Sequence, residues 1–106
     1  MKIIWSDFAS KILLDIFLYH KKVAGKNIAS KIKTKIFNST KQLIQHPNSG
    51  KIEKSLEQLS EGHRYLVSGN YKVVYKKVKE GILITDVFDT RQNPIKINDP
   101  KRKPSR

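Results

Sequence analysis

The spacing of apolar residues at the start of the chain predicts a strand followed by a helix. Residues 2–5 contain a three-residue apolar run, which is long enough for one short strand. Ser6 and Asp7 follow it, and both are good N-cap residues for a helix. Apolar side chains then recur every three or four positions until Gly25 interrupts the pattern. We therefore expect a strand at 2–5 and an amphipathic helix that ends near Gly25.

A second amphipathic helix is expected after Gly25. Most of its lysines lie off one apolar stripe, which consists of Ile28, Ala29, Ile32, Ile36, Phe37, Thr40, Leu43 and Ile44. His46 and Pro47 end the pattern. Because only a few residues connect the two helices, they must run antiparallel as a hairpin. Neither helix is stable alone, so both apolar stripes need a partner surface.

The second half of the chain changes to an alternating pattern. Residues 48–62 are polar and rich in turn formers, and we interpret them as an ordered loop with at most one short helical turn. Beyond them the pattern predicts three antiparallel strands joined by tight turns, at 63–68, 71–79 and 82–89. Both faces of these strands carry apolar residues. The helices are therefore expected to cover one face and another segment the other.

Together these elements predict an α+β fold: an N-terminal strand, an antiparallel helical hairpin, and a three-stranded antiparallel meander packed on the helices. Val73 and Tyr75 are expected on one face of the meander, and Val74 on the other. A chain of 106 residues has room for one core, which we assign to residues 1–92. Residues 93–106 combine prolines with basic residues and are expected to form a flexible basic tail.

Charge narrows the choice of partners. Lys and Arg total 22 against 9 Asp and Glu, which gives a net charge of +13. Such an excess attracts RNA, DNA, anionic membranes or acidic proteins, although lysines also serve simply to solvate a surface. The chain has no cysteine, which excludes disulfides and thiolate sites. The apolar run at the N-terminus is too short for a signal peptide or a membrane span, so we expect a cytoplasmic protein without a membrane partner.

Common enzyme signatures are missing. The sequence has no Gly-rich phosphate loop, no HExxH and no GxSxG, and its three histidines lack metal-ligand spacing. We therefore expect neither a metal nor a cofactor. The remaining candidates for chemistry are cations and polar groups in and around the predicted strands.

Four phrases of the sequence resemble the RelE/ParE superfamily of type II toxin-antitoxin toxins, which includes plasmid stabilisation proteins. They occur in the family's order, as PNSGK at 47–51, GHRYL at 62–66, GNYKVVY at 69–75 and VFDTRQNP at 87–94. The predicted order of strand, two helices and three strands is also that of the superfamily. The resemblance covers nearly the whole chain.

The resemblance implies a toxin that a cognate antitoxin keeps silent by folding on it. RelE-like members cut mRNA in the ribosome without a metal, whereas ParE-like members inhibit DNA gyrase and need no catalytic group. The residues leave these two modes nearly balanced. RelE-like nucleases place a tyrosine or histidine near the carboxyl end, where this chain has no aromatic residue after Phe88. The alternative from another class is a non-toxic basic module that binds nucleic acid.

Two arginines match the family's basic positions. Arg64 lies near the start of the meander and Arg91 after its last strand, and a nuclease would use both as phosphate clamps. A single polyanionic target is then expected to contact both. The structural alternatives are a bond from Arg64 to loop carbonyls and a surface role for Arg91 at the strand end.

Other residues would assist such a site. His63 could act as a general acid or base, and Asp89 could handle a proton, although a turn-edge histidine and a strand-end aspartate that bonds the adjacent turn are the plainer interpretations. Phosphate contacts are expected from Lys51, Lys54, Lys76 and Lys77, of which at most one of the last two can face the site. Solvated lysines are the alternative. Core packing is favoured over base stacking for Tyr65, Tyr71 and Tyr75.

Overall fold

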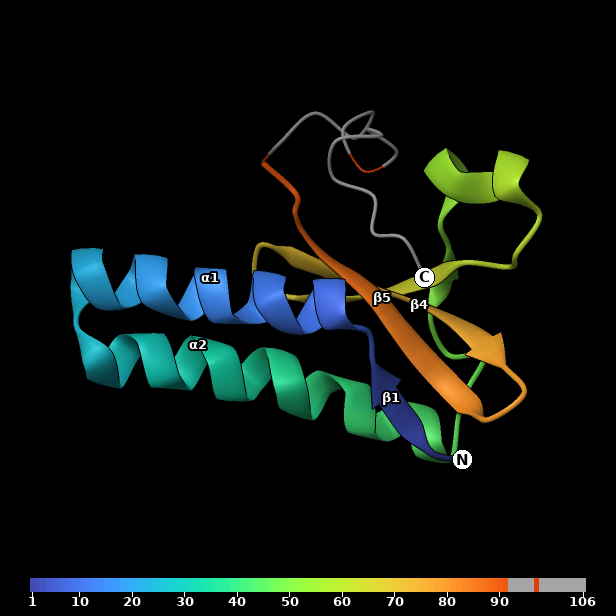
Figure 1. The fold of residues 1–106 in the computed structure, drawn as a ribbon, viewed down its shortest axis with the longest axis horizontal. Coiled ribbons are helices and arrows are strands. Elements are labelled where there is room, and N and C mark those ends of the chain that lie inside the picture. Colours follow the sequence, from blue (N-terminus) through green and yellow to red (C-terminus); the bar gives the residue numbers. More distant parts are fainter. Residues whose placement is uncertain (92–96, 98–106) are drawn as a thin grey trace.

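Five strands form one sheet with the order β1-β5-β4-β3-β2 in the computed structural model, which describes residues 1–91 and Ile97. The strands are β1 (Ile3–Trp5), β2 (Lys51–Ile52), β3 (Arg64–Ser68), β4 (Tyr71–Val78) and β5 (Gly81–Asp89). Strands β3, β4 and β5 form the predicted antiparallel meander. The N-terminal strand β1 extends this sheet by pairing in parallel with β5 (Figure 1).

The helices form the predicted antiparallel hairpin along one face of the sheet (Figure 1). Helix α1 spans Asp7–Ala24, and Ser6 caps it by accepting a hydrogen bond from the Ala9 N–H at 3.0 Å. Gly25 makes the turn with a φ of 92°, a conformation that suits glycine. Helix α2 spans Lys26–Ser39, and the 3₁₀ helix η1 (Thr40–Ile44) continues it. The predicted second helix is therefore correct in extent, but its last turns are 3₁₀.

The segment expected to be a loop contains more structure than predicted. Its two-residue strand β2 pairs antiparallel with β3, and a short 3₁₀ helix, η2 (Lys54–Leu59), follows. The helical turn was anticipated, whereas the strand was not. The residues assigned to a basic tail lie outside the described part of the chain, apart from Ile97.

Two apolar clusters lie on opposite faces of the sheet. The larger one, under the helices, joins Val73 and Tyr75 to residues of α1, α2 and β5. The smaller one joins Val74 and Phe88 to Leu56 of η2 and to Ile97. This confirms the predicted alternation of Val73 and Val74, and it identifies η2 and Ile97 as the cover of the second face. In the described part of the chain, no helix is long and apolar enough to span a lipid bilayer.

Candidate functional site

Arg64 is bound by its own loop. Its Nη1 donates to the Gly50 carbonyl at 2.8 Å and lies 3.5 Å from the Asn48 carbonyl. The same loop is held by the buried Tyr75 hydroxyl, which accepts from the Gly50 N–H and donates to the Pro47 carbonyl, both at 2.9 Å. The structural alternative for Arg64, a bond to loop carbonyls, is therefore the one observed. We call this arrangement of Tyr75, Arg64 and residues 47–50 the loop clasp.

His63 and Lys76 both lie close to Glu61 on the second face of the sheet. Glu61 Oε1 lies 3.0 Å from Lys76 Nζ and 3.8 Å from His63 Nε2. The His63 side chain is buried, and that of Lys76 is only 13% exposed. An incoming phosphate would have to displace Glu61 before it reached either group.

The remaining lysines predicted to bind phosphate lie on three different elements. Lys77 is exposed and lies on the opposite face of β4 from Lys76, as the strand alternation predicts. Lys51 and Lys54 are exposed on β2 and η2. These positions fit solvated lysines, and their predicted phosphate contacts stay predictions.

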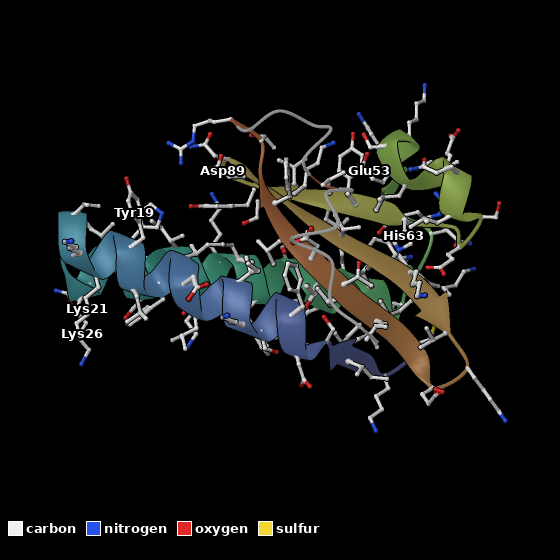
Figure 2. All side chains as sticks on the ribbon, turned by 45° about the horizontal axis from the view of Figure 1, so that its top comes forward. Tyr19, Lys21, Lys26, Glu53, His63 and Asp89 are labelled. Carbon is white, nitrogen blue, oxygen red and sulfur yellow. The ribbon has the colours of Figure 1, made fainter. Side chains whose placement is uncertain are left out.

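The two arginines lie near opposite ends of strand β3. Arg64 and Ser68 are the two ends of β3, roughly 13 Å apart at the usual rise of about 3.3 Å per residue. Arg91 lies at the Ser68 end, because Asp89 pairs with Tyr71, and Tyr71 with Ser68. Figure 2 shows that Asp89 and His63, which are close in sequence to the two arginines, lie apart from each other along the sheet. A single polyanionic target would have to span this separation, and its predicted contact with both guanidinium groups stays a prediction.

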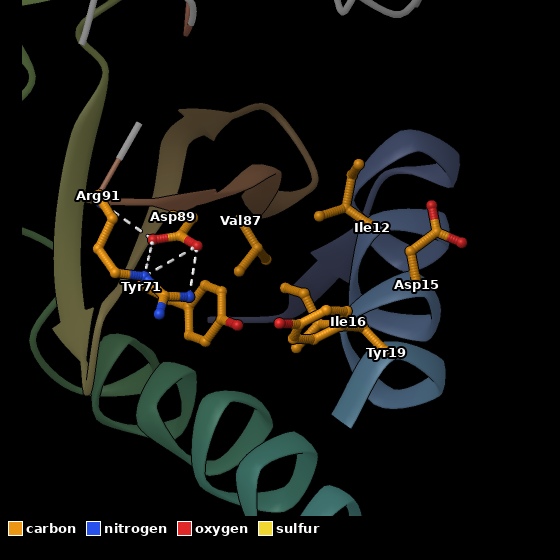
Figure 3. Close-up of a pocket in the computed structure, with 8 residues that line it drawn as sticks. All are labelled: Ile12, Asp15, Ile16, Tyr19, Tyr71, Val87, Asp89 and Arg91. Atoms are coloured by element: carbon orange, nitrogen blue, oxygen red, sulfur yellow. Dashed lines mark hydrogen bonds and ion pairs between the residues drawn. The ribbon is translucent and has the colours of Figure 1, made fainter. Parts of the chain in front are cut away.

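Arg91 instead forms an ion pair at the rim of a cleft. Its Nη2 and Nε lie 2.7 and 3.0 Å from the carboxylate oxygens of Asp89, and its backbone N–H donates to Asp89 Oδ1 at 2.9 Å. The cleft, of about 350 Å³, opens between α1 and the end of β5 (Figure 3). Its lining residues are Ile12, Asp15, Ile16, Tyr19, Tyr71, Val87, Asp89 and Arg91. Of the residues predicted to be catalytic, only Asp89 and Arg91 come together here.

The pKa values of two cleft residues, Asp89 and Tyr71, differ from their usual values. The hydrogen bond from the Arg91 side chain holds the pKa of Asp89 below its usual value, although partial burial opposes this. Burial raises the pKa of Tyr71, and the nearby Asp89 carboxylate raises it further. Around neutral pH the cleft therefore contains a neutral phenol beside a compensated ion pair.

The sequence matches the family described as "ParE toxin of type II toxin-antitoxin system, parDE" over residues 3–94. The chain belongs to the ParE toxin family. A solved structure described as "Chromosomal ParDE TA system from P. aeruginosa" superimposes with a TM-score of 0.71 at 20% identity. The match covers 84% of this chain and 95% of that chain, and at this identity it concerns the fold. A comparison with curated proteins gave no match.

Membership in the ParE family confirms the resemblance to the RelE/ParE superfamily and the predicted α+β fold. It places the chain among the toxins of type II toxin-antitoxin systems, and thereby supports a cognate antitoxin as a partner.

Sequence reasoning missed the residues of this ParE-family chain that surround Arg91. His20 Nε2 and the Tyr71 hydroxyl are hydrogen-bonded at 2.9 Å, across 51 positions of sequence. Asp15 and Tyr19 reach the cleft from α1. One signal was present: Tyr19 and His20 continue the apolar stripe of the first helix with polar side chains, as expected where a helix leaves its core for a partly open surface.

The ion pair predicts a titration experiment. Arg91→Gln is expected to raise the pKa of Asp89 towards its usual value, because the largest stabilising contact of the carboxylate is lost. Carbon-detected NMR of the side-chain carboxyl measures this directly. Lys77→Gln is the control, because it removes the same charge at the other end of β4. It is expected to leave the pKa of Asp89 unchanged.

The sign of the stability effect follows from the lowered pKa of Asp89. The pair contributes fully above the pKa of the unfolded carboxyl, and its contribution is lost as the pH falls through the folded value. Asp89→Asn is expected to remove this part of the acid dependence of unfolding. An equal Asp89 pKa in wild type and Arg91→Gln would mean that the ion pair does not form in solution.

Proposed function

We propose that this ParE-family toxin inhibits growth in the cytoplasm by binding DNA gyrase, and that it does not cut mRNA. The observation that carries the proposal is the dispersal of the candidate catalytic groups. Arg64 is bound in the loop clasp, Glu61 holds Lys76 and contacts His63, and Arg91 is paired with Asp89 at the other end of β3.

Metal-independent RNA cleavage has a strict geometric requirement. Cations and proton-transferring groups must surround one phosphate, because they stabilise its developing charge while the 2′-hydroxyl attacks. In this chain the four residues predicted to be catalytic instead contact Glu61, one another or the backbone. A protein that acts by binding needs no such convergence, and the ParE family match favours that mode.

One observation favours the RelE-like alternative. His20 and Tyr71, which can both transfer protons, are hydrogen-bonded to each other and lie near Arg91. If mRNA cleavage occurs, this group is the place to seek it, and the roles predicted for Arg64, Arg91, His63 and Asp89 stay predictions. The test below therefore measures both activities.

The purified chain is to be added to gyrase with relaxed plasmid and, separately, to ribosomes stalled on a defined mRNA. We expect loss of supercoiling at a toxin concentration that leaves the mRNA intact, and filamentous growth on expression in cells. Mixing the toxin with its antitoxin should restore supercoiling. Cleavage of mRNA in the ribosomal A site with normal supercoiling would overturn the proposal, and normal growth with abundant folded protein would support the non-toxic module.

A further inference from the structure

A second pocket adjoins the cleft on the far side of Tyr71 and Arg91. It has a volume of about 180 Å³ and lies where the helical hairpin meets the turn between β3 and β4. Three side chains that donate hydrogen bonds or carry positive charge reach it from separate elements: His20 of α1, Lys35 of α2 and Arg91 after β5. We call it the cationic pocket.

The cationic pocket is suited to an anionic group. No Asp or Glu within the described part of the chain lines it. Among the described residues, Lys35 takes part in none of the ion pairs. Arg91 binds Asp89 through Nε and Nη2, which leaves Nη1 outside that ion pair. The pocket is of a size for one carboxylate or phosphate group, and its charge favours either.

The neighbouring cleft has the opposite character. Its walls are apolar at Ile12, Ile16 and Val87, and its charged groups are two carboxylates, Asp15 and Asp89, against the single Arg91. Because Tyr71 and Arg91 line both spaces, the cleft and the cationic pocket adjoin each other, and we call them together the two-part groove. An occupant must therefore place an anionic group on one side of Tyr71 and an apolar group on the other.

Backbone groups at the cleft add to this picture. Strand β1 pairs with β5 only from Ile82 to Ile84, and within the described residues no strand pairs with that edge of β5 beyond Ile84. Helix α1 and β5 diverge from this point (Figure 1). An edge of this kind can hydrogen-bond an extended peptide.

We propose that the two-part groove binds a peptide segment of a protein partner, with an acidic side chain in the cationic pocket and an apolar side chain in the cleft. The proposal rests on the proposed function only in taking the partner of this toxin to be a protein. A nucleic acid fits the groove less well, because its next phosphate would meet the carboxylates of Asp15 and Asp89. The net charge of +13 attracts an acidic segment.

Capped decapeptides that carry one leucine and one glutamate, two to six residues apart, test the proposal on the isotope-labelled full chain by NMR. One spacing is expected to shift the resonances of Gly69 and Asn70 together with the methyl groups of Ile12 and Val87. The matched glutamine peptide should bind about tenfold more weakly, since it lacks the charge-assisted hydrogen bonds. Lys35→Gln should weaken binding of the glutamate peptide to the same extent and leave the affinity for the glutamine peptide unchanged.

Lys41→Gln is the matched control, because Lys41 is exposed on η1 and does not line the groove. Equal affinity of the glutamate and glutamine peptides, or equal losses in the two lysine variants, would overturn the proposal. A short DNA duplex that shifts the same resonances at lower concentration than any peptide would also overturn it. Gyrase inhibition is measured separately, so peptide binding without loss of supercoiling would reject the proposed function alone.

Discussion

Replacing Tyr75 with alanine is expected to lower the free energy of unfolding by about 4 kcal/mol. The side chain is 0% exposed and packs in the apolar cluster under the helices. Its removal leaves a cavity and also breaks the loop clasp. Tyr75→Phe keeps the ring and removes only the hydroxyl, so it leaves the buried Gly50 N–H without its partner. We expect a loss of about 2 kcal/mol for that variant, measured by urea unfolding.

Val67→Ala is the control for these measurements, because Val67 is 63% exposed on β3 and its truncation should change stability by less than about 0.5 kcal/mol. A double-mutant cycle between Tyr75→Phe and Arg64→Ala then tests whether the two side chains act together. Both bind Gly50, one through its N–H and the other through its carbonyl, so their effects should not add. Additive effects, or a Tyr75→Phe variant as stable as wild type, would show that the clasp does not order the loop.

Much of the fold was predictable because periodicity reports which side of an element is buried. The spacing of three and four in the helices and of two in the strands predicted both apolar faces of the meander, including the opposite directions of Val73 and Val74. Periodicity does not report which strand pairs with which. The parallel pairing of β1 with β5 and the two-residue strand β2 depend on neighbours far along the chain.

The candidate site was less predictable for the same reason. Residue type suggested that Arg64 binds a phosphate or loop carbonyls, and only the positions of Asn48 and Gly50 decide between the two. Asp89 and Arg91 were predicted because both lie in the phrase at 87–94 that resembles the RelE/ParE superfamily. His20 and Lys35 were not, because only the packing of the hairpin beside the β3–β4 turn brings them to Arg91.

Gly81→Ala is expected to destabilise the protein by about 3 kcal/mol or more, because strain and a backbone collision act together. Gly81 begins β5 with a φ of 149°, which side chains rarely adopt. A Cβ at this position would press into the carbonyl oxygen of Lys2, which accepts a hydrogen bond from the Ile82 N–H at 2.8 Å. We expect loss of hydrogen-exchange protection from Ile82 to Ile84, where β1 pairs with β5.

Gly25→Ala separates the two causes, since Gly25 also has a positive φ but a Cβ there would meet nothing within 4 Å. This substitution should destabilise the protein only through backbone strain, by about 1–3 kcal/mol. The consequence of Gly81→Ala reaches the groove, because the Ser6 N–H at the start of α1 donates to the Ile84 carbonyl at 3.0 Å and so fixes the helix against β5. If β1 moves, the α1 wall of the cleft moves with it. The Gly81→Ala variant should therefore lose the part of the peptide affinity that comes from the leucine in the cleft. Equal costs for the two glycine substitutions would mean that the close approach of Lys2 does not exist in solution.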